Sequence, residues 1–168
     1  MSHSNDFGLR QVKILEDLHF FFAVRNDSSL QRLLLSSREN SSENEVTKWL
    51  SFKSRDDDTI FRVIEDVSTG TAVGYLQLTK IAFSRNYQLG ICCGSDFRGK
   101  GAGRIALTDG FDLLKIANAN KVILEVDKSN HKAISLYTSE GFRTVGEMLR
   151  HIFIHGEFVD VVIMEKLI

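Results

Sequence analysis

The central part of the sequence, residues 87–142, contains two apolar runs that are separated by an amphipathic segment. The runs are residues 89–93 (LGICC) and 122–126 (VILEV), and both have the length and composition of buried strands. The segment between them has a helical pattern with these apolar members: Ile105, Leu107, Phe111, Leu114 and Ile116. A strand, a helix and a strand in this order predict a βαβ unit whose strands are neighbours in one sheet. A second helix is expected over residues 130–140.

Three helical segments are expected in the first third of the chain. They cover residues 18–26, 28–35 and 43–52. The third has the clearest start, because Ser42 and Glu45 stand at the spacing of a capping box. The polar residues before Ser42 are expected to form a loop.

The remaining segments have strand patterns that are bounded by turns. They are residues 8–15, 60–65, 72–81, 87–93, 122–126, 143–154 and 158–167. Gly74 is expected to mark a β-bulge inside the third of these strands. The order of strands and helices predicts a single α/β (α+β) domain over residues 1–168.

Composition narrows the class of protein. The chain has 168 residues, a net charge of −1 and 43% apolar residues, which describes an ordinary globular domain without a nucleic-acid surface. No apolar run has the length of a membrane span, and the polar start MSHSNDFG is not a signal peptide, so a cytoplasmic protein is expected. Cys92 and Cys93 are adjacent and cannot form an ordinary disulfide with each other. No metal site is expected, because no further cysteine or histidine cluster completes one.

A basic, glycine-rich turn joins the first apolar run to the helix that follows. Its residues are Arg98, Gly99, Lys100, Gly101, Ala102 and Gly103. The first backbone N–H groups of a helix have no partners and point along the positive end of the helix dipole. Glycines let a ligand approach the backbone closely, and the two basic side chains add positive charge. The turn therefore predicts a binding site for a phosphate or pyrophosphate.

Two phosphate-binding motifs match this turn only in part. A nucleotide P-loop fits as far as Lys100, but Gly101 follows where a magnesium-binding serine or threonine is needed. The dinucleotide fingerprint fits Gly101, Gly103 and Ala106, with Glu125 at a suitable distance along the chain. Its strand, however, should end directly before the first glycine, and the chain offers no second nucleotide-binding half.

The turn and the second helix together give a more specific pattern. Arg98-x-x-Gly101-x-Gly103, then a strand, then Asn130-x-x-Ala133-x-x-x-Tyr137-x-x-x-Gly141-Phe142, resembles the GNAT superfamily of acetyl-coenzyme A-dependent N-acetyltransferases. The resemblance implies a mixed, mostly antiparallel sheet of seven strands that is splayed between strands 4 and 5, with helices on both faces. It also implies acetyl-CoA as the cofactor and a small-molecule amine as the acceptor.

The resemblance assigns roles to individual residues. The expected cofactor-binding residues are Ile91, Cys92, Cys93, Arg98, Gly99, Lys100, Gly101, Ala102, Gly103, Asn130, Ala133 and Tyr137. Tyr137 is expected to protonate the departing thiolate, although packing alone would also explain a tyrosine there. Glu125 is the candidate general base, because a carboxylate inside an apolar strand needs a purpose. An exposed or ion-paired Glu125, or a chain of water molecules, remains the alternative.

The acceptor is the least determined part of the activity. Subgroups of the superfamily that act on nucleotide-linked 4-amino-sugars, on spermidine and on ribosomal-protein amino termini all resemble the chain. Arg25, Asn26 and Gln88 are expected to contact the acceptor. Basic and acidic residues are interleaved in the region before residue 50: Arg25, Asp27, Arg32, Arg38, Glu39, Glu43 and Glu45. This mixture favours the nucleotide-linked sugar, with spermidine and protein amino termini as alternatives, and a non-catalytic CoA-binding module as an alternative of another class. A homodimer through the last strand, residues 158–167, is plausible because edge strands invite pairing.

Overall fold

The chain folds around one sheet. The computed structural model describes residues 6–38 and 40–168; residues 1–5, which belong to the polar start of the chain, and Glu39 lie outside the described residues. The strands are β1 (Phe7–Arg10), β2 (Thr59–Asp66), β3 (Thr71–Lys80), β4 (Asn86–Cys93), β5 (Lys121–Asp127), β6 (Arg143–Ile154) and β7 (Glu157–Leu167). The helices are α1 (Ile14–Asn26), α2 (Ser28–Leu33), α3 (Glu43–Arg55), α4 (Ala102–Ile116) and α5 (His131–Ser139), with a short 3₁₀ turn at Ser95–Phe97.

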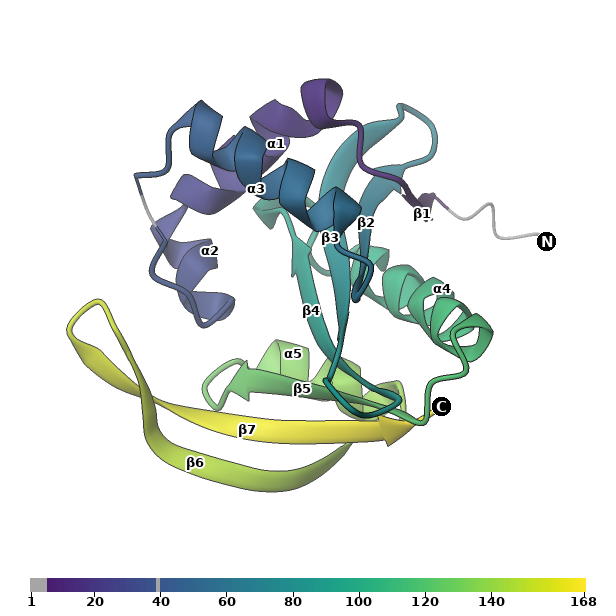
Figure 1. The fold of residues 1–168 in the computed structure, drawn as a ribbon. Helices are drawn as coiled ribbons and strands as arrows, with labels where there is room; N and C mark the ends of the chain where they lie inside the picture. Colours follow the sequence, from purple (N-terminus) through teal and green to yellow (C-terminus); the bar gives the residue numbers. More distant parts are fainter. Residues whose placement is uncertain (1–5, 39) are drawn as a thin grey trace.

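The sheet has seven strands in the order β1-β2-β3-β4-β5-β7-β6. All neighbours are antiparallel except β4 and β5, which are parallel, so the predicted mixed sheet is confirmed. Helices α1, α2 and α3 lie on one face, and α4 and α5 lie on the other (Figure 1). The larger core packs between the sheet and α4 and α5, and it includes Leu76, Leu107, Leu124 and Met164. An aromatic cluster around Phe21 fills the opposite face.

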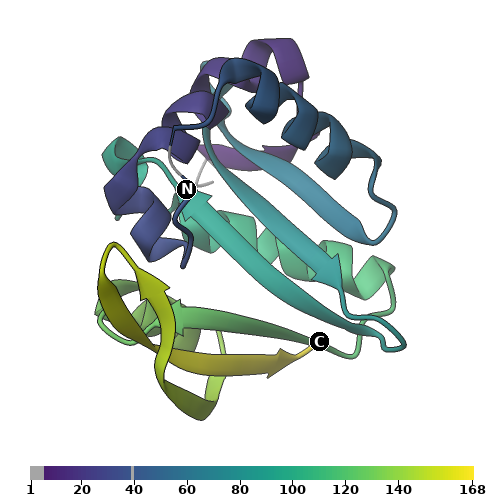
Figure 2. The same cartoon turned by 60° about the vertical axis from the view of Figure 1, so that its left-hand side comes forward.

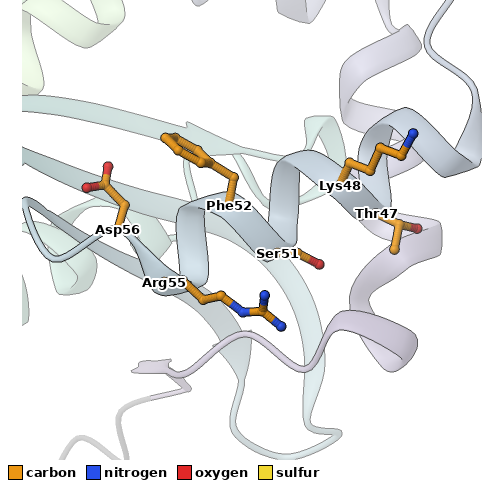
Figure 3. Close-up of a pocket in the computed structure, with 6 residues that line it drawn as sticks. All are labelled: Thr47, Lys48, Ser51, Phe52, Arg55 and Asp56. Atoms are coloured by element: carbon orange, nitrogen blue, oxygen red, sulfur yellow. The ribbon is translucent and has the colours of Figure 1, made fainter.

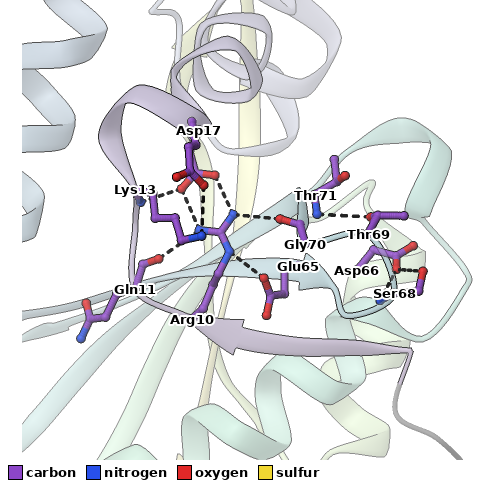
Figure 4. A network of polar contacts seen from close by, with 11 residues as sticks. Arg10, Gln11, Lys13, Asp17, Glu65, Asp66, Ser68, Thr69, Gly70 and Thr71 are labelled. Atoms are coloured by element: carbon purple, nitrogen blue, oxygen red, sulfur yellow. Dashed lines mark hydrogen bonds and ion pairs between the residues drawn. The ribbon is translucent and has the colours of Figure 1, made fainter.

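The first strand is shorter than its alternating pattern predicts. The strand expected over residues 8–15 ends at Arg10, and α1 begins at Ile14. Asp17 explains the change, because its buried carboxylate accepts hydrogen bonds from the Lys13 backbone at 2.8 Å and from both terminal nitrogens of Arg10. Arg10 also binds Glu65 of β2, so one arginine joins β1, α1 and β2 (Figure 4). This long-range network turns the chain into a helix where the local pattern continues as a strand.

Two local signals in the sequence are confirmed. Ser42 and Glu45 form both halves of a capping box at the start of α3. Next to Gly74, the register between β2 and β3 shifts by one residue, as a bulge requires. A Cβ atom at Gly74 would lie 2.4 Å from the carbonyl oxygen of Cys92, so only glycine permits this approach of β3 to β4.

The last strand does not lie at an edge of the sheet. β7 pairs with β5 on one side and with β6 on the other, and the edge is formed by β6. The expectation that residues 158–167 offer a free edge is therefore wrong. The reason is that the hairpin after α5 returns β7 to the inside, next to β5.

Candidate active site

Strands β4 and β5 are paired only at one end. Their register joins Asn86 to Lys121, Tyr87 to Val122 and Gln88 to Ile123. Residues 89–93 and 124–127 continue each strand without a partner in the other. Figure 2 shows the two strands diverging beyond this short ladder. The splay between strands 4 and 5 is thus present, and it leaves one backbone edge of β4 without a strand to pair with.

The glycine turn stands at the end of this open edge. Gly99 and Gly101 have φ of +76° and +93°, a conformation that suits glycine. Gly101 is the N-cap of α4 and no side chain caps the helix, so the first amides of α4 have no intrahelical partner. A Cβ atom at Gly99 or Gly101 would meet nothing within 4 Å, and Arg98 and Lys100 are exposed beside them. Open space, free amides and positive charge together suit an anion such as a pyrophosphate.

Gly103 differs from the other glycines of the turn. A Cβ atom at Gly103 would lie 3.4 Å from Leu136 Cδ2 and 3.8 Å from Cys93 Sγ, and the neighbouring Ala102 is buried. Gly103 therefore lies within contact range of α5 and β4, whereas Ala102 packs with residues of β1, β2 and β3.

The last residues of β4 have apolar surroundings. Ile91 and Cys93 pack on the face that α4 covers, and Cys92 packs on the other face with Val24 and Leu30. Burial raises the pKa of both thiols, that of Cys93 to about 11, so both stay protonated at neutral pH. These three residues can contribute backbone groups at the open edge, where Arg98 Nε already donates to the carbonyl oxygen of Cys93 at 3.2 Å.

Helix α5 carries the second half of the motif. Asn130 is its N-cap, and the side-chain oxygen accepts the N–H of Ala133 at 3.2 Å. Tyr137 lies two turns further along and packs its ring against Phe142. The helix is thus fixed at its start by a cap and near its end by an aromatic contact.

Tyr137 is close to the end of β4. Burial raises the pKa of its hydroxyl group above the usual range, and the neighbouring Cys93 thiol acts in the same direction. A raised pKa keeps the phenol protonated at neutral pH, so Tyr137 holds a proton at the splay. The same shift makes it a weaker acid, and proton donation from it depends on position.

Glu125 and Gln88 mark the beginning of the splay on the other face. Gln88 and Ile123 form the last pair between β4 and β5, and Glu125 lies two residues after Ile123. Glu125 points away from the apolar face of β5 and is exposed, so burial gives no reason for its charge, and its role as general base stays a prediction. An exposed carboxylate is solvated by water and needs no ion-pair partner. Glu125 lies on the same face of the sheet as α1 and α2.

A cavity of about 220 Å³ lies on this same face. Its lining residues are Val24, Arg25, Gln31, Leu34, Ser36, Trp49, Tyr75, Gln77 and Gly90. The guanidinium of Arg25 stacks on the Trp49 ring at 4.7 Å, and its buried Nε has no hydrogen-bond partner among residues 6–38 and 40–168. Burial, with repulsion from Arg38, lowers the pKa of Arg25. None of the described residues that line the cavity is a carboxylate, and these residues favour an acceptor oxygen over a second cation.

Several residues of this cavity are not among the site residues predicted from the sequence. Tyr75 and Gln77 alternate with Leu76 and Leu78 along β3. This period of two indicates that Tyr75 and Gln77 share the face opposite the larger core. Trp49 gave no signal beyond its place in a helix. Asn26, in contrast, uses its amide within the fold: it donates to the carbonyl oxygens of Phe22 and Ser41, and accepts from the Ser41 N–H.

A larger hollow of about 390 Å³ lies elsewhere, on the outer surface of α3 (Figure 3). Thr47, Lys48, Ser51, Phe52, Arg55 and Asp56 line it. Because all these residues belong to α3 and its end, the hollow is separate from the splay. Within the described ranges, no three metal-ligating side chains gather in one place, and no helix is both long and apolar enough to cross a bilayer.

The chain is similar to several known proteins. It is 33% identical over 100 residues to spermidine N(1)-acetyltransferase of Escherichia coli K12, and 31% identical over 101 residues to that of Vibrio cholerae serotype O1. The first match covers 56% of this chain and only 52% of the E. coli protein, and the second covers 59% and 58%. Each match therefore spans little more than half of the relative.

Solved structures extend the likeness to the whole fold. A spermidine N-acetyltransferase from Vibrio cholerae in complex with CoA and spermine superposes with a TM-score of 0.89 at 25% identity, over 98% of this chain and 96% of that one. A GNAT-family acetyltransferase from Streptococcus pneumoniae, 21% identical, has the same fold with a TM-score of 0.79 over 96% and 99% of the two chains. The family model described as "Acetyltransferase (GNAT) family" matches residues 19–142. The chain belongs to the acetyltransferase (GNAT) family.

Proposed function

We propose that the protein is an acetyl-CoA-dependent N-acetyltransferase that acts on a primary amine of a small molecule. The observation that carries the proposal is the short parallel ladder between β4 and β5, which ends beside an uncapped helix start. Such an edge can bind an extended ligand through backbone hydrogen bonds, and the helix start can hold its pyrophosphate.

Each half of the site then has a task in the reaction. Bound acetyl-CoA supplies an acyl thioester. The amides of residues 101–103, with Arg98 and Lys100, hold the phosphates, and the backbone of residues 91–93 orients the pantetheine arm. Tyr137 gives its proton to the departing thiolate. Glu125, exposed on the opposite face, is the candidate to take the proton of the attacking amine.

Spermidine or a related polyamine is the first acceptor candidate. The similarities to spermidine acetyltransferases support it over the nucleotide-linked amino sugar that the charge pattern of the sequence favoured. A nucleotide-linked amino sugar remains a second candidate because of one specific observation, the unpartnered Nε of Arg25 in the cavity.

The test is thiol release from acetyl-CoA with a panel of amines: spermidine, a UDP-linked 4-amino-sugar and a peptide with a free amino terminus. We expect release with spermidine and a melting temperature that rises with acetyl-CoA. Thiol release with none of the amines would contradict the proposed activity. Release with the sugar alone would retain the activity and replace the acceptor.

A further inference from the structure

One arginine reaches across the splay to two carboxylates. Arg32 belongs to α2, whereas Asp127 ends β5 and Glu157 begins β7. Its Nη2 lies 4.0 Å from Asp127 Oδ2, and its Nη1 lies 3.5 Å from Glu157 Oε2. Both distances exceed those of well-formed hydrogen bonds between a guanidinium and a carboxylate. The arginine is therefore near both acids without binding either of them tightly.

Asp127 is the unusual member of this group. Its side chain is only 4% exposed, and Oδ1 accepts the backbone N–H and the hydroxyl of Ser129, each at 2.7 Å. Oδ2 is also buried and has no hydrogen-bond partner in the part of the chain that the structure describes. Buried carboxylate oxygens are costly unless a donor satisfies them. The oxygen next to the splay thus has an unused capacity for a strong donor.

The charges of the group point to the kind of donor. Two carboxylates face one guanidinium, so the group as a whole carries an excess negative charge. An ammonium group is compact and offers several N–H donors in free directions, whereas a guanidinium is a planar fork. Arg32 is 34% exposed and can turn toward solvent if another cation takes its place.

We propose that Asp127 and Glu157 form a subsite for a second ammonium group of the acceptor, and that Arg32 occupies this subsite until the acceptor displaces it. The inference rests on the proposed function, with a polyamine as the acceptor. The reacting amine lies at the beginning of the splay, and the distal ammonium extends along β5 to Asp127. Binding exchanges one ion pair for another, and no covalent bond changes.

The competing explanation is that these ion pairs only tie α2 to the β5–β7 region. Two variants distinguish this structural role from the ammonium subsite. In Asp127→Asn we expect the KM for spermidine to rise about tenfold relative to the KM for butylamine, which lacks a second amine. In Arg32→Ala the competitor for the subsite is gone, so the KM for spermidine falls, by about threefold. If Arg32 and Asp127 serve only as a structural tie, the KM should change in the same direction in both variants and for both amines.

Three controls make the result unambiguous. Asp112→Asn removes an equal charge from an exposed ion pair on α4 and should leave both KM values at the wild-type level. Thermal melts check folding, and the exposed Glu157→Gln repeats the test in the same direction if Asp127→Asn does not fold. The subsite is refuted if Asp127→Asn and Arg32→Ala shift the KM for spermidine in the same direction, or if the wild type uses butylamine as well as spermidine. Absence of thiol release with every amine would instead remove the proposed function, and this inference with it.

Discussion

Two arginines of this protein each stand between two carboxylates from other elements, and their geometry differs. Arg10 holds Asp17 at 2.7 and 2.8 Å and Glu65 at 2.7 Å. Arg32 stays 4.0 and 3.5 Å from its two acids. Arg10 joins elements in the fully paired part of the sheet, β1 to β3, which we call the closed part. Arg32 spans the part where β4 and β5 diverge, which we call the open part.

The difference follows from the strand pairing. β1, β2 and β3 form ladders over most of their length, so the elements that carry Arg10 and its partners have fixed separations. No ladder joins β4 to β5 beyond Ile123, and nothing in the sheet fixes the distance from α2 to Asp127. We infer that the closed part supplies stability and the open part supplies binding and catalysis. Four predictions test this division.

The largest expected effect belongs to the open part. Tyr137→Phe should lower turnover by about 100- to 10,000-fold, because only the proton donor is lost, while the KM values and the melting temperature stay near those of the wild type. Steady-state kinetics with acetyl-CoA and the amine from the panel measure this. Turnover within about threefold of the wild type would mean that Tyr137 serves only in packing.

Substitutions in the closed part should lower the stability of the fold. Asp17→Asn breaks a buried ion pair and should lower the free energy of unfolding by about 3–5 kcal/mol, as measured by urea denaturation. The neighbouring Glu16→Gln is the matched control, since its ion pair with Lys13 is exposed and contributes at most about 1 kcal/mol. Equal effects of the two variants would contradict the division.

The glycine turn should affect cofactor binding. Acetyl-CoA at 100 times its dissociation constant should stabilise the wild type by about 2.7 kcal/mol. Gly101→Val should lose this gain, because a branched side chain resists positive φ and fills the open space. Gly156→Val is the matched control, because it introduces the same backbone strain in the β6–β7 turn. This variant should still be stabilised by acetyl-CoA. Retained stabilisation in a folded Gly101→Val protein would place the phosphates elsewhere.

The smallest effect is expected for Arg32. Because its contacts are long and partly exposed, Arg32→Ala should change the free energy of unfolding by at most about 1 kcal/mol. Urea denaturation of this variant beside Asp17→Asn gives the comparison directly. A loss as large as that of Asp17→Asn would show that Arg32 is a structural tie.

Local patterns predicted much of the fold. The capping box of Ser42 and Glu45, the bulge beside Gly74 and the helix that Asn130 caps depend on residues a few positions apart, and each is confirmed. The prediction failed where distant residues decide. Asp17 begins α1 earlier than the alternating pattern suggests, and β7 lies inside the sheet instead of at its edge.

The sequence by itself determined the order of elements, the glycine turn and the family motif, because hydrophobic period and residue spacing act along the chain. Only the tertiary structure decided which residues meet across it: the cavity beside Arg25, the neighbours of Gly103 on α5 and β4, and the contact of Arg32 with Asp127. The assigned roles of Tyr137, Glu125 and the acceptor-binding residues remain predictions. Contacts between distant segments depend on how far the strands separate, and no local spacing in the sequence encodes that distance.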